Sequence, residues 1–160
     1  MLYTFGRVGA VTKMKVEDVY VQGRRTWLNL HEKGGKLHSM PAHHSLDAYM
    51  QAYIDGAGLA DDKKGVLFRT AIRRSGVLSD RPMTQADVYR MIGRRALAAG
   101  ILTDIGCHSF RATGITEYMR NGGKLEIAQR MANHESARTT GLYDRRDDDL
   151  TLDEVERILI

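Results

Sequence analysis

The chain has 160 residues, 42% of them hydrophobic and 28% charged, a composition that suits one globular domain with a single core. Lysine and arginine number 24 against 20 acidic residues, so the net charge of +4 favours polyanionic partners only modestly. One cysteine excludes an internal disulfide, and no apolar run approaches the roughly 20 residues of a membrane helix. With no visible signal peptide, we expect a cytoplasmic protein that does not associate with membranes.

The N-terminal part of the chain predicts a short helix and then a small sheet. Apolar residues recur at spacing three within Met1–Val11, which predicts a helix there. The Gly34-Gly35 pair favours a tight hairpin turn, because both positions can adopt positive φ. A three-stranded antiparallel sheet is therefore expected over residues 15–41, with strand-like segments at 16–21, 27–30 and 37–40.

Helical periodicity dominates after Pro41. Apolar spacings of three and four predict a helix that Gly56 ends, and a polar loop around Pro82 is expected after it. Thr84 can cap a further helix that runs to about Ala99. The side chains expected to face inward from that helix are Val88, Met91, Ile92 and Leu97.

Three more helices are expected toward the C-terminus, over residues 108–121, over about 125–132, and on the segment that leads to Tyr143. The fold class predicted from these elements is α+β: mainly helical, with a small three-stranded antiparallel sheet near the N-terminus. We expect a single domain over residues 1–160.

The segment His108-Ser109-Phe110-Arg111 contains the first chemical signal. Positions three apart lie on one face of a helix, so His108 and Arg111 would present an imidazole and a guanidinium together. An arginine can bind two phosphate oxygens with its planar fork, and a histidine can exchange a proton near neutral pH. On its own an H-x-x-R pattern is weak, because it often arises by chance.

The order of several polar residues along the chain is much more specific. Arg7 lies in the first predicted helix, Lys33 stands beside the Gly34-Gly35 turn, and Tyr143 follows His134 by nine residues. With this order the chain resembles the tyrosine recombinase (phage integrase) family, over nearly its whole length. The matching residues are Arg7, Lys33, His108, Arg111, His134 and Tyr143.

The resemblance implies an enzyme that cuts and rejoins double-stranded DNA through a 3′-phosphotyrosyl link. It implies that Arg7 and Arg111 bind the scissile phosphate, and that His134 donates a hydrogen bond to it. Such groups can stabilise charge on the non-bridging oxygens without a metal ion. No cofactor is expected, and ATP is unnecessary because the covalent link conserves the energy of the broken bond.

The same resemblance implies roles for three residues in proton transfer and attack. Tyr143 would be the nucleophile, His108 the acceptor of its proton, and Lys33 the donor of a proton to the leaving 5′ oxygen. Lys36 competes with Lys33 for the last role, since both lie near the hairpin turn. Lys33 is favoured because it precedes the glycine pair, as the family lysine precedes its turn.

One position departs from the family pattern. Family members usually carry an acid three residues after the first arginine, where this chain has Ala10. That acid helps to orient the arginine. The alanine therefore puts the preorganisation of Arg7, and with it the reaction rate, in doubt.

Other chemical readings of the sequence are weaker. The spacing of His31, His38, His43 and His44 matches no usual zinc pattern, so no metal site is expected. The Gly34-Gly35-Lys36 run lacks the flanking residues of a P-loop, so nucleotide binding is rejected.

Two alternatives to a site-specific recombinase stay open at this point. One is a type IB topoisomerase, which shares this chemistry and which an assay of supercoil relaxation would reveal. The other is a catalytically weak remnant that binds DNA without cutting it, and it draws support from Ala10.

The ends of the chain carry two further expectations. Only a few residues precede Arg7, so we expect a truncated N-terminal edge and no core-binding domain, the separate helical domain that family members usually place before this one. Leu152–Ile160 has an apolar face and is too short for a stable lone helix, so it is expected to pack on its own domain or on a neighbouring protomer. The latter would give self-association on DNA through the C-terminal helix.

Overall fold

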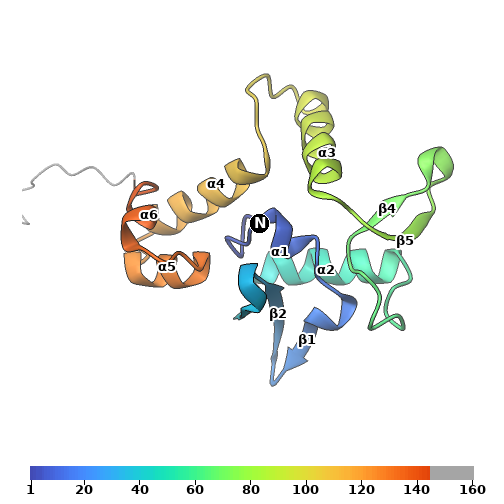
Figure 1. The fold of residues 1–160 in the computed structure, drawn as a ribbon, viewed down its shortest axis with the longest axis horizontal. Helices are drawn as coiled ribbons and strands as arrows, with labels where there is room; N and C mark the ends of the chain where they lie inside the picture. Colours follow the sequence, from blue (N-terminus) through green and yellow to red (C-terminus); the bar gives the residue numbers. More distant parts are fainter. Residues whose placement is uncertain (145–160) are drawn as a thin grey trace, which may run out of the picture.

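The computed structural model describes residues 1–144, apart from the side chains of Arg74 and Ala137. The fold is α+β, as predicted from the sequence (Figure 1). In chain order its helices are α1 (Val8–Val11), α2 (His44–Gly56), α3 (Gln85–Ala98), α4 (Cys107–Arg120), α5 (Leu125–Ala132) and α6 (Ala137–Gly141). Its strands are β1 (Val19–Gln22), β2 (Arg25–His31), β3 (Leu37–Pro41), β4 (Arg69–Ala71) and β5 (Leu78–Pro82), and short 3-10 turns are η1 (Val16–Asp18), η2 (Lys33–Gly35) and η3 (Arg73–Ser75).

The predicted three-stranded sheet is confirmed. Strands β1, β2 and β3 pair in that order, all antiparallel, with Leu28 between Val19 and Met40 in the register. Burial alternates along β2, as expected for a strand with one face on the core. Gly34 and Gly35 both adopt positive φ, 78° and 74°, at the turn that joins β2 to β3.

Two hydrophobic clusters form the core. The first gathers under the sheet and α2, and includes Ala10, Leu28 and Leu67. The second joins Phe5 to buried residues of α4 and α5, among them Ile115. Met131 packs against both clusters. In Figure 1, α4, α5 and α6 form a group beside α1 and the sheet.

The helix predicted over Met1–Val11 is wrong, because α1 covers only Val8–Val11. Phe5 has a φ of +51°, a left-handed conformation that a helix cannot contain, and its buried ring packs into the second cluster. Gly114 of α4 lets this N-terminal turn approach, since a Cβ there would collide with the carbonyl of Leu2. Burial of Phe5 therefore overrides the local helical spacing.

The polar loop expected around Pro82 is also wrong, because β4 and β5 form a two-stranded hairpin there. Arg69 holds the base of this hairpin: it pairs with Asp80 at 3.2 Å and with Asp62, and its Nε donates to the carbonyl of Val66. The two strands do not show the alternation of apolar and polar residues that predicts a strand. The sequence pattern alone therefore could not reveal the hairpin.

Helix α3 begins at the predicted cap, where Thr84 and Asp87 exchange the hydrogen bonds of a capping box. Val88 and Ile92 are buried as expected, but Leu97 is 72% exposed, so its predicted inward position is wrong. Within residues 1–144 no helix is long and apolar enough to cross a membrane. The predicted helix Leu152–Ile160 lies outside the described residues.

Candidate active site

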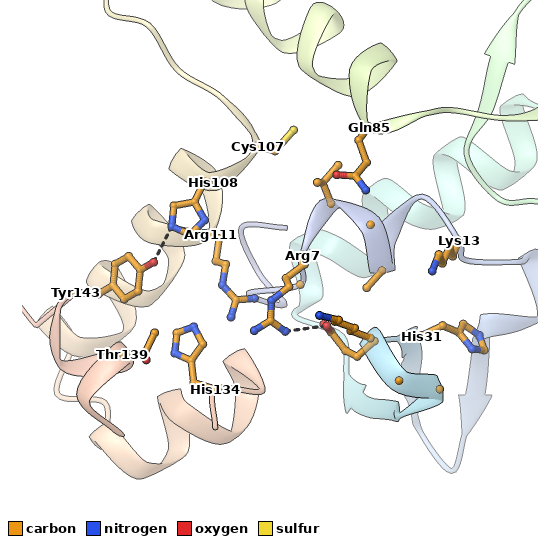
Figure 2. A pocket seen from close by; sticks show the side chains of 18 residues that line it. Arg7, Lys13, His31, Gln85, Cys107, His108, Arg111, His134, Thr139 and Tyr143 are labelled. Atoms are coloured by element: carbon orange, nitrogen blue, oxygen red, sulfur yellow. Dashed lines mark hydrogen bonds and ion pairs between the residues drawn. The ribbon is translucent and has the colours of Figure 1, made fainter. Parts of the chain in front are cut away.

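The six residues singled out in the sequence line one cavity of about 810 Å³. They reach it from five places: Arg7 from the start of α1, Lys33 from η2, His108 and Arg111 from α4, His134 from the end of α5, and Tyr143 from the end of α6. Figure 2 shows His108, His134 and Tyr143 on one side of this cavity, with the Arg7 and Arg111 guanidinium groups directed toward each other in its middle. Residues up to 136 positions apart in sequence thus converge on one volume.

Tyr143 and His108 are in direct contact. The Tyr143 hydroxyl lies 2.7 Å from His108 Nε2, a hydrogen-bonding distance (Figure 2). The Tyr143 backbone is held as well, since its carbonyl accepts a hydrogen bond from Thr116 Oγ1 at 3.2 Å. A phenol and an imidazole so placed can exchange a proton without further movement.

His134 stacks on the Tyr143 ring, with ring centroids 6.1 Å apart and planes 16° apart. Burial, followed by the positive charges of Arg111 and Arg7, lowers the pKa of His134 from about 6.5 to about 4. The imidazole is therefore neutral near pH 7. Its Nδ1 lies 2.8 Å from the hydroxyl of the fully buried Thr140, which fixes the orientation of the ring.

This lowered pKa predicts a dependence of stability on pH. Between about pH 6.5 and pH 4 the unfolded chain binds a proton at His134 that the folded chain does not, so folding stability falls as pH falls through this window. We expect His134→Asn to lose less stability than the unmodified protein between about pH 7 and about pH 5. Urea unfolding at the two pH values measures this difference, with the exposed His44→Asn as the control. Equal losses in all three proteins would contradict the assignment.

Arg111 is the most enclosed charged residue of the cavity, with 3% of its surface exposed. One terminal nitrogen donates to the carbonyl of Phe5 and the other to the carbonyl of Ala132 at 2.5 Å. Burial, and then repulsion from Arg7, lowers the pKa of Arg111. A guanidinium has five N–H donors, so these two bonds leave donors for an anion in the cavity.

Arg7 is held differently, because its side chain is 47% exposed. Its Nη1 lies 2.9 Å from the Glu32 carboxylate, the ion pair drawn as a dashed line from Arg7 in Figure 2. Its Nη2 donates a long hydrogen bond of 3.4 Å to the carbonyl of Asn133. Ala10, at the position where tyrosine recombinases usually carry an acid, is buried in the first hydrophobic cluster.

Glu32 is a residue of the cavity that the sequence analysis missed. It lies one position before Lys33, and its side chain is 3% exposed. A glutamate near a turn carries no signal in the sequence, since such residues are usually solvated. Only the pairing of the hairpin with α1 brings Glu32 to Arg7.

The two candidate lysines of the hairpin differ in position. Lys33 lines the cavity, whereas Lys36 does not, although both side chains are exposed. Lys13 adds a further cation to the cavity lining. With Arg7 and Arg111, these groups make the cavity strongly cationic, with Glu32 as the neighbouring counter-charge, which suits a phosphate.

The remaining polar residues of the lining include His31, Gln85 and Cys107. His31 Nε2 is bound to the buried Asp18 carboxylate at 2.9 Å, so it braces the end of β2. Burial raises the pKa of Cys107. In the part of the chain that the structure describes, no three His, Cys, Asp or Glu side chains gather as metal ligands would.

The chain is similar to known proteins over most of its length. The phage integrase family model matches residues 1–149. The tyrosine recombinase XerD of Staphylococcus haemolyticus (strain JCSC1435) is 27% identical over 145 residues, which are 89% of this chain and 47% of that protein. The chain thus spans about half the length of the curated relatives it matches.

Solved structures give the same fold. The crystal structure of XerA recombinase superposes with a TM-score of 0.74 and 26% identity, over 98% of this chain and 53% of that one. The XerH site-specific recombinase, in a pre-cleavage complex with its difH substrate, gives a TM-score of 0.73 at 21% identity, over 98% of this chain and 44% of that one.

Proposed function

Because this chain belongs to the phage integrase family, we propose that it is the catalytic part of a site-specific DNA recombinase that cuts and rejoins strands through Tyr143. The hydrogen bond between Tyr143 and His108, inside a cavity with two guanidinium groups and two lysines, carries this proposal. The enzyme would act on double-stranded DNA in the cytoplasm.

The first step is attack by the Tyr143 hydroxyl oxygen on the phosphorus of a DNA phosphodiester. His108 Nε2 takes the hydroxyl proton, for which its distance of 2.7 Å is suitable. The new P–O bond joins Tyr143 to the 3′ side of the break, and the bond from phosphorus to the 5′ oxygen is broken. Lys33 then gives a proton to the departing 5′ oxygen.

The charge that builds up on the non-bridging oxygens is met by Arg7, Arg111 and His134. The two guanidinium groups supply positive charge in the middle of the cavity, as the transition state of phosphoryl transfer requires. His134 is neutral, so it can help only through a hydrogen on Nε2. That tautomer requires the Thr140 hydroxyl to donate to Nδ1, and the distance of 2.8 Å allows it.

Rejoining is the same step in reverse with a different strand. A 5′-hydroxyl of a second DNA end gives its proton to the neutral Lys33 amine and attacks the phosphotyrosyl phosphorus. The P–O bond to Tyr143 breaks, and the phenolate takes back the proton held by His108. The number of phosphoester bonds is unchanged, so no ATP is consumed, and the charge is stabilised by side chains without a metal ion. Exchange between two DNA sites needs more than one protomer. We therefore propose that the protein self-associates on DNA and that the C-terminal segment 152–160 makes the contact. This segment lies outside the described residues.

Covalent capture of DNA tests the proposal. The probe is a pool of nicked duplexes with randomised sequence, from which the short fragment carrying the 5′-hydroxyl diffuses away after cleavage and so prevents rejoining. We expect a protein–DNA adduct that survives denaturation, and sequencing of the trapped DNA defines a substrate. Failure of the unmodified protein to form any adduct with the pool would reject the proposed activity.

DNA affinity should depend steeply on salt. Each phosphate contact releases counterions, so the slope of log affinity against log salt rises by roughly 0.9 per contact. We expect Lys33→Ala to reduce this slope by about one. Lys64→Ala is the matched control, because Lys64 lies outside the cavity and already pairs with Glu17 at 2.7 Å. Titrations at several salt concentrations measure both; identical slopes for Lys33→Ala and the unmodified protein would remove Lys33 from the DNA contact.

A further inference from the structure

Glu32 is a buried carboxylate at the edge of a cationic cavity. Its side chain is 3% exposed, and among the described residues its carboxylate has a single hydrogen-bonding partner, Arg7. Removing a carboxylate from water is costly unless a cation compensates for it. Glu32 and Arg7 therefore depend on each other for their positions.

Arg7 has little else to fix its guanidinium. Its side chain is 47% exposed, and its other bond, to the carbonyl of Asn133, is 3.4 Å long. An arginine side chain carries much rotational freedom, and holding it at one place costs conformational entropy. Ala10, on the same short helix, has no polar group to offer and lies in the core. The orientation of Arg7 thus rests on Glu32.

The backbone of Glu32 is held by the hairpin. Its N–H donates to the carbonyl of Lys36 at 2.9 Å, at the place where η2 leaves the β2–β3 ladder. Its neighbour His31 is fixed through Asp18. The carboxylate that reaches Arg7 therefore comes from a rigid part of the sheet.

We propose that Glu32 is a positioning residue that holds the Arg7 guanidinium in the orientation needed to bind the scissile phosphate. This inference rests on the proposed function, since it gives Glu32 its role through Arg7. Glu32 itself does not bind the phosphate, because a carboxylate repels an anion. Its contribution is to the rate of cleavage and not to the affinity for DNA.

A double-mutant cycle on the cleavage rate tests this role. The full chain is mixed in excess with a nicked duplex of the sequence enriched by covalent capture, and adduct formation is followed in a single turnover. We expect Glu32→Gln to slow capture roughly 10- to 100-fold, with DNA affinity changed by less than about twofold. In an Arg7→Ala background the same change should slow capture by less than about twofold. Glu117→Gln removes a carboxylate from an exposed ion pair on α4 and is the matched control.

A second substrate separates Arg7 from Lys33. Replacing the bridging 5′ oxygen with sulfur makes a leaving group that needs no proton donor, so the slow cleavage by Lys33→Ala should be restored. The slow cleavage by Glu32→Gln should persist, because Arg7 acts on the non-bridging oxygens. If the sulfur substrate restored the cleavage rate of Glu32→Gln, Glu32 would act through Lys33 and the proposal would be wrong.

The remaining outcomes are also decisive. Unchanged capture by Glu32→Gln, or an equal loss with and without Arg7, would overturn the role of Glu32 while leaving the proposed function intact. If the unmodified protein captured no DNA, the proposed function would fail first. If thermal unfolding shows that Glu32→Gln does not fold, Glu32→Asp replaces it in the test. Aspartate keeps the charge but retracts it by one methylene, and the same loss of capture rate is expected.

Discussion

Tyr143→Phe is expected to abolish covalent DNA capture while leaving DNA affinity within about twofold. The substitution removes one hydroxyl, which is the proposed attacking group, and keeps the ring that packs against the second hydrophobic cluster and stacks on His134. The groups proposed to bind the phosphate, Arg7 and Arg111, are untouched. Loss of the adduct with retained binding separates the nucleophile from the binding surface.

Capture of the nicked pool and a binding titration, run in parallel, give the two measurements. Tyr49→Phe serves as the control, because its ring is 67% exposed on α2 and outside the cavity. An adduct of undiminished yield with Tyr143→Phe would show that another side chain attacks the phosphate.

Arg111→Lys is expected to slow capture by roughly 100-fold or more and to lower the free energy of unfolding by about 2–4 kcal/mol. Lysine keeps the charge, but its single ammonium cannot donate to the carbonyls of Phe5 and Ala132 and also bind a phosphate with a planar fork. At least one buried carbonyl then loses its partner. The same residue thus contributes to the fold and to the site.

Urea unfolding and single-turnover capture measure these two effects. Arg120→Lys is the matched control, since Arg120 lies on the same helix, is 59% exposed and pairs with Glu117. If Arg111→Lys had the same free energy of unfolding as the unmodified protein, the two hydrogen bonds from Arg111 to backbone carbonyls would not contribute to stability. One that captures DNA at the normal rate would remove Arg111 from phosphate binding.

Much of the architecture could be predicted from the sequence where local patterns decide the structure. The Gly34-Gly35 pair marks the hairpin, because positive φ at both positions is a local requirement. Thr84 marks the start of α3, because capping involves only the first turn. The order of the six polar residues along the chain predicted that they would form one site, and all six line one cavity. Their chemical roles stay predictions.

The sequence could not reveal features that depend on contacts between distant segments. The left-handed conformation of Phe5 is set by burial against α4, more than 100 residues away. Glu32 becomes a cavity residue only when β2 pairs with its neighbours and α1 packs beside it. In each case tertiary contacts override a weak local preference.

The short segment from Phe5 to Ala10 passes from one hydrophobic cluster to the other, and Arg7 lies in its middle. Because the segment is anchored by a buried residue in each cluster, the place of Arg7 depends on how the two clusters pack together. A substitution that shifts one cluster would therefore move the Arg7 guanidinium relative to Glu32 or to Arg111, even from a position outside the cavity.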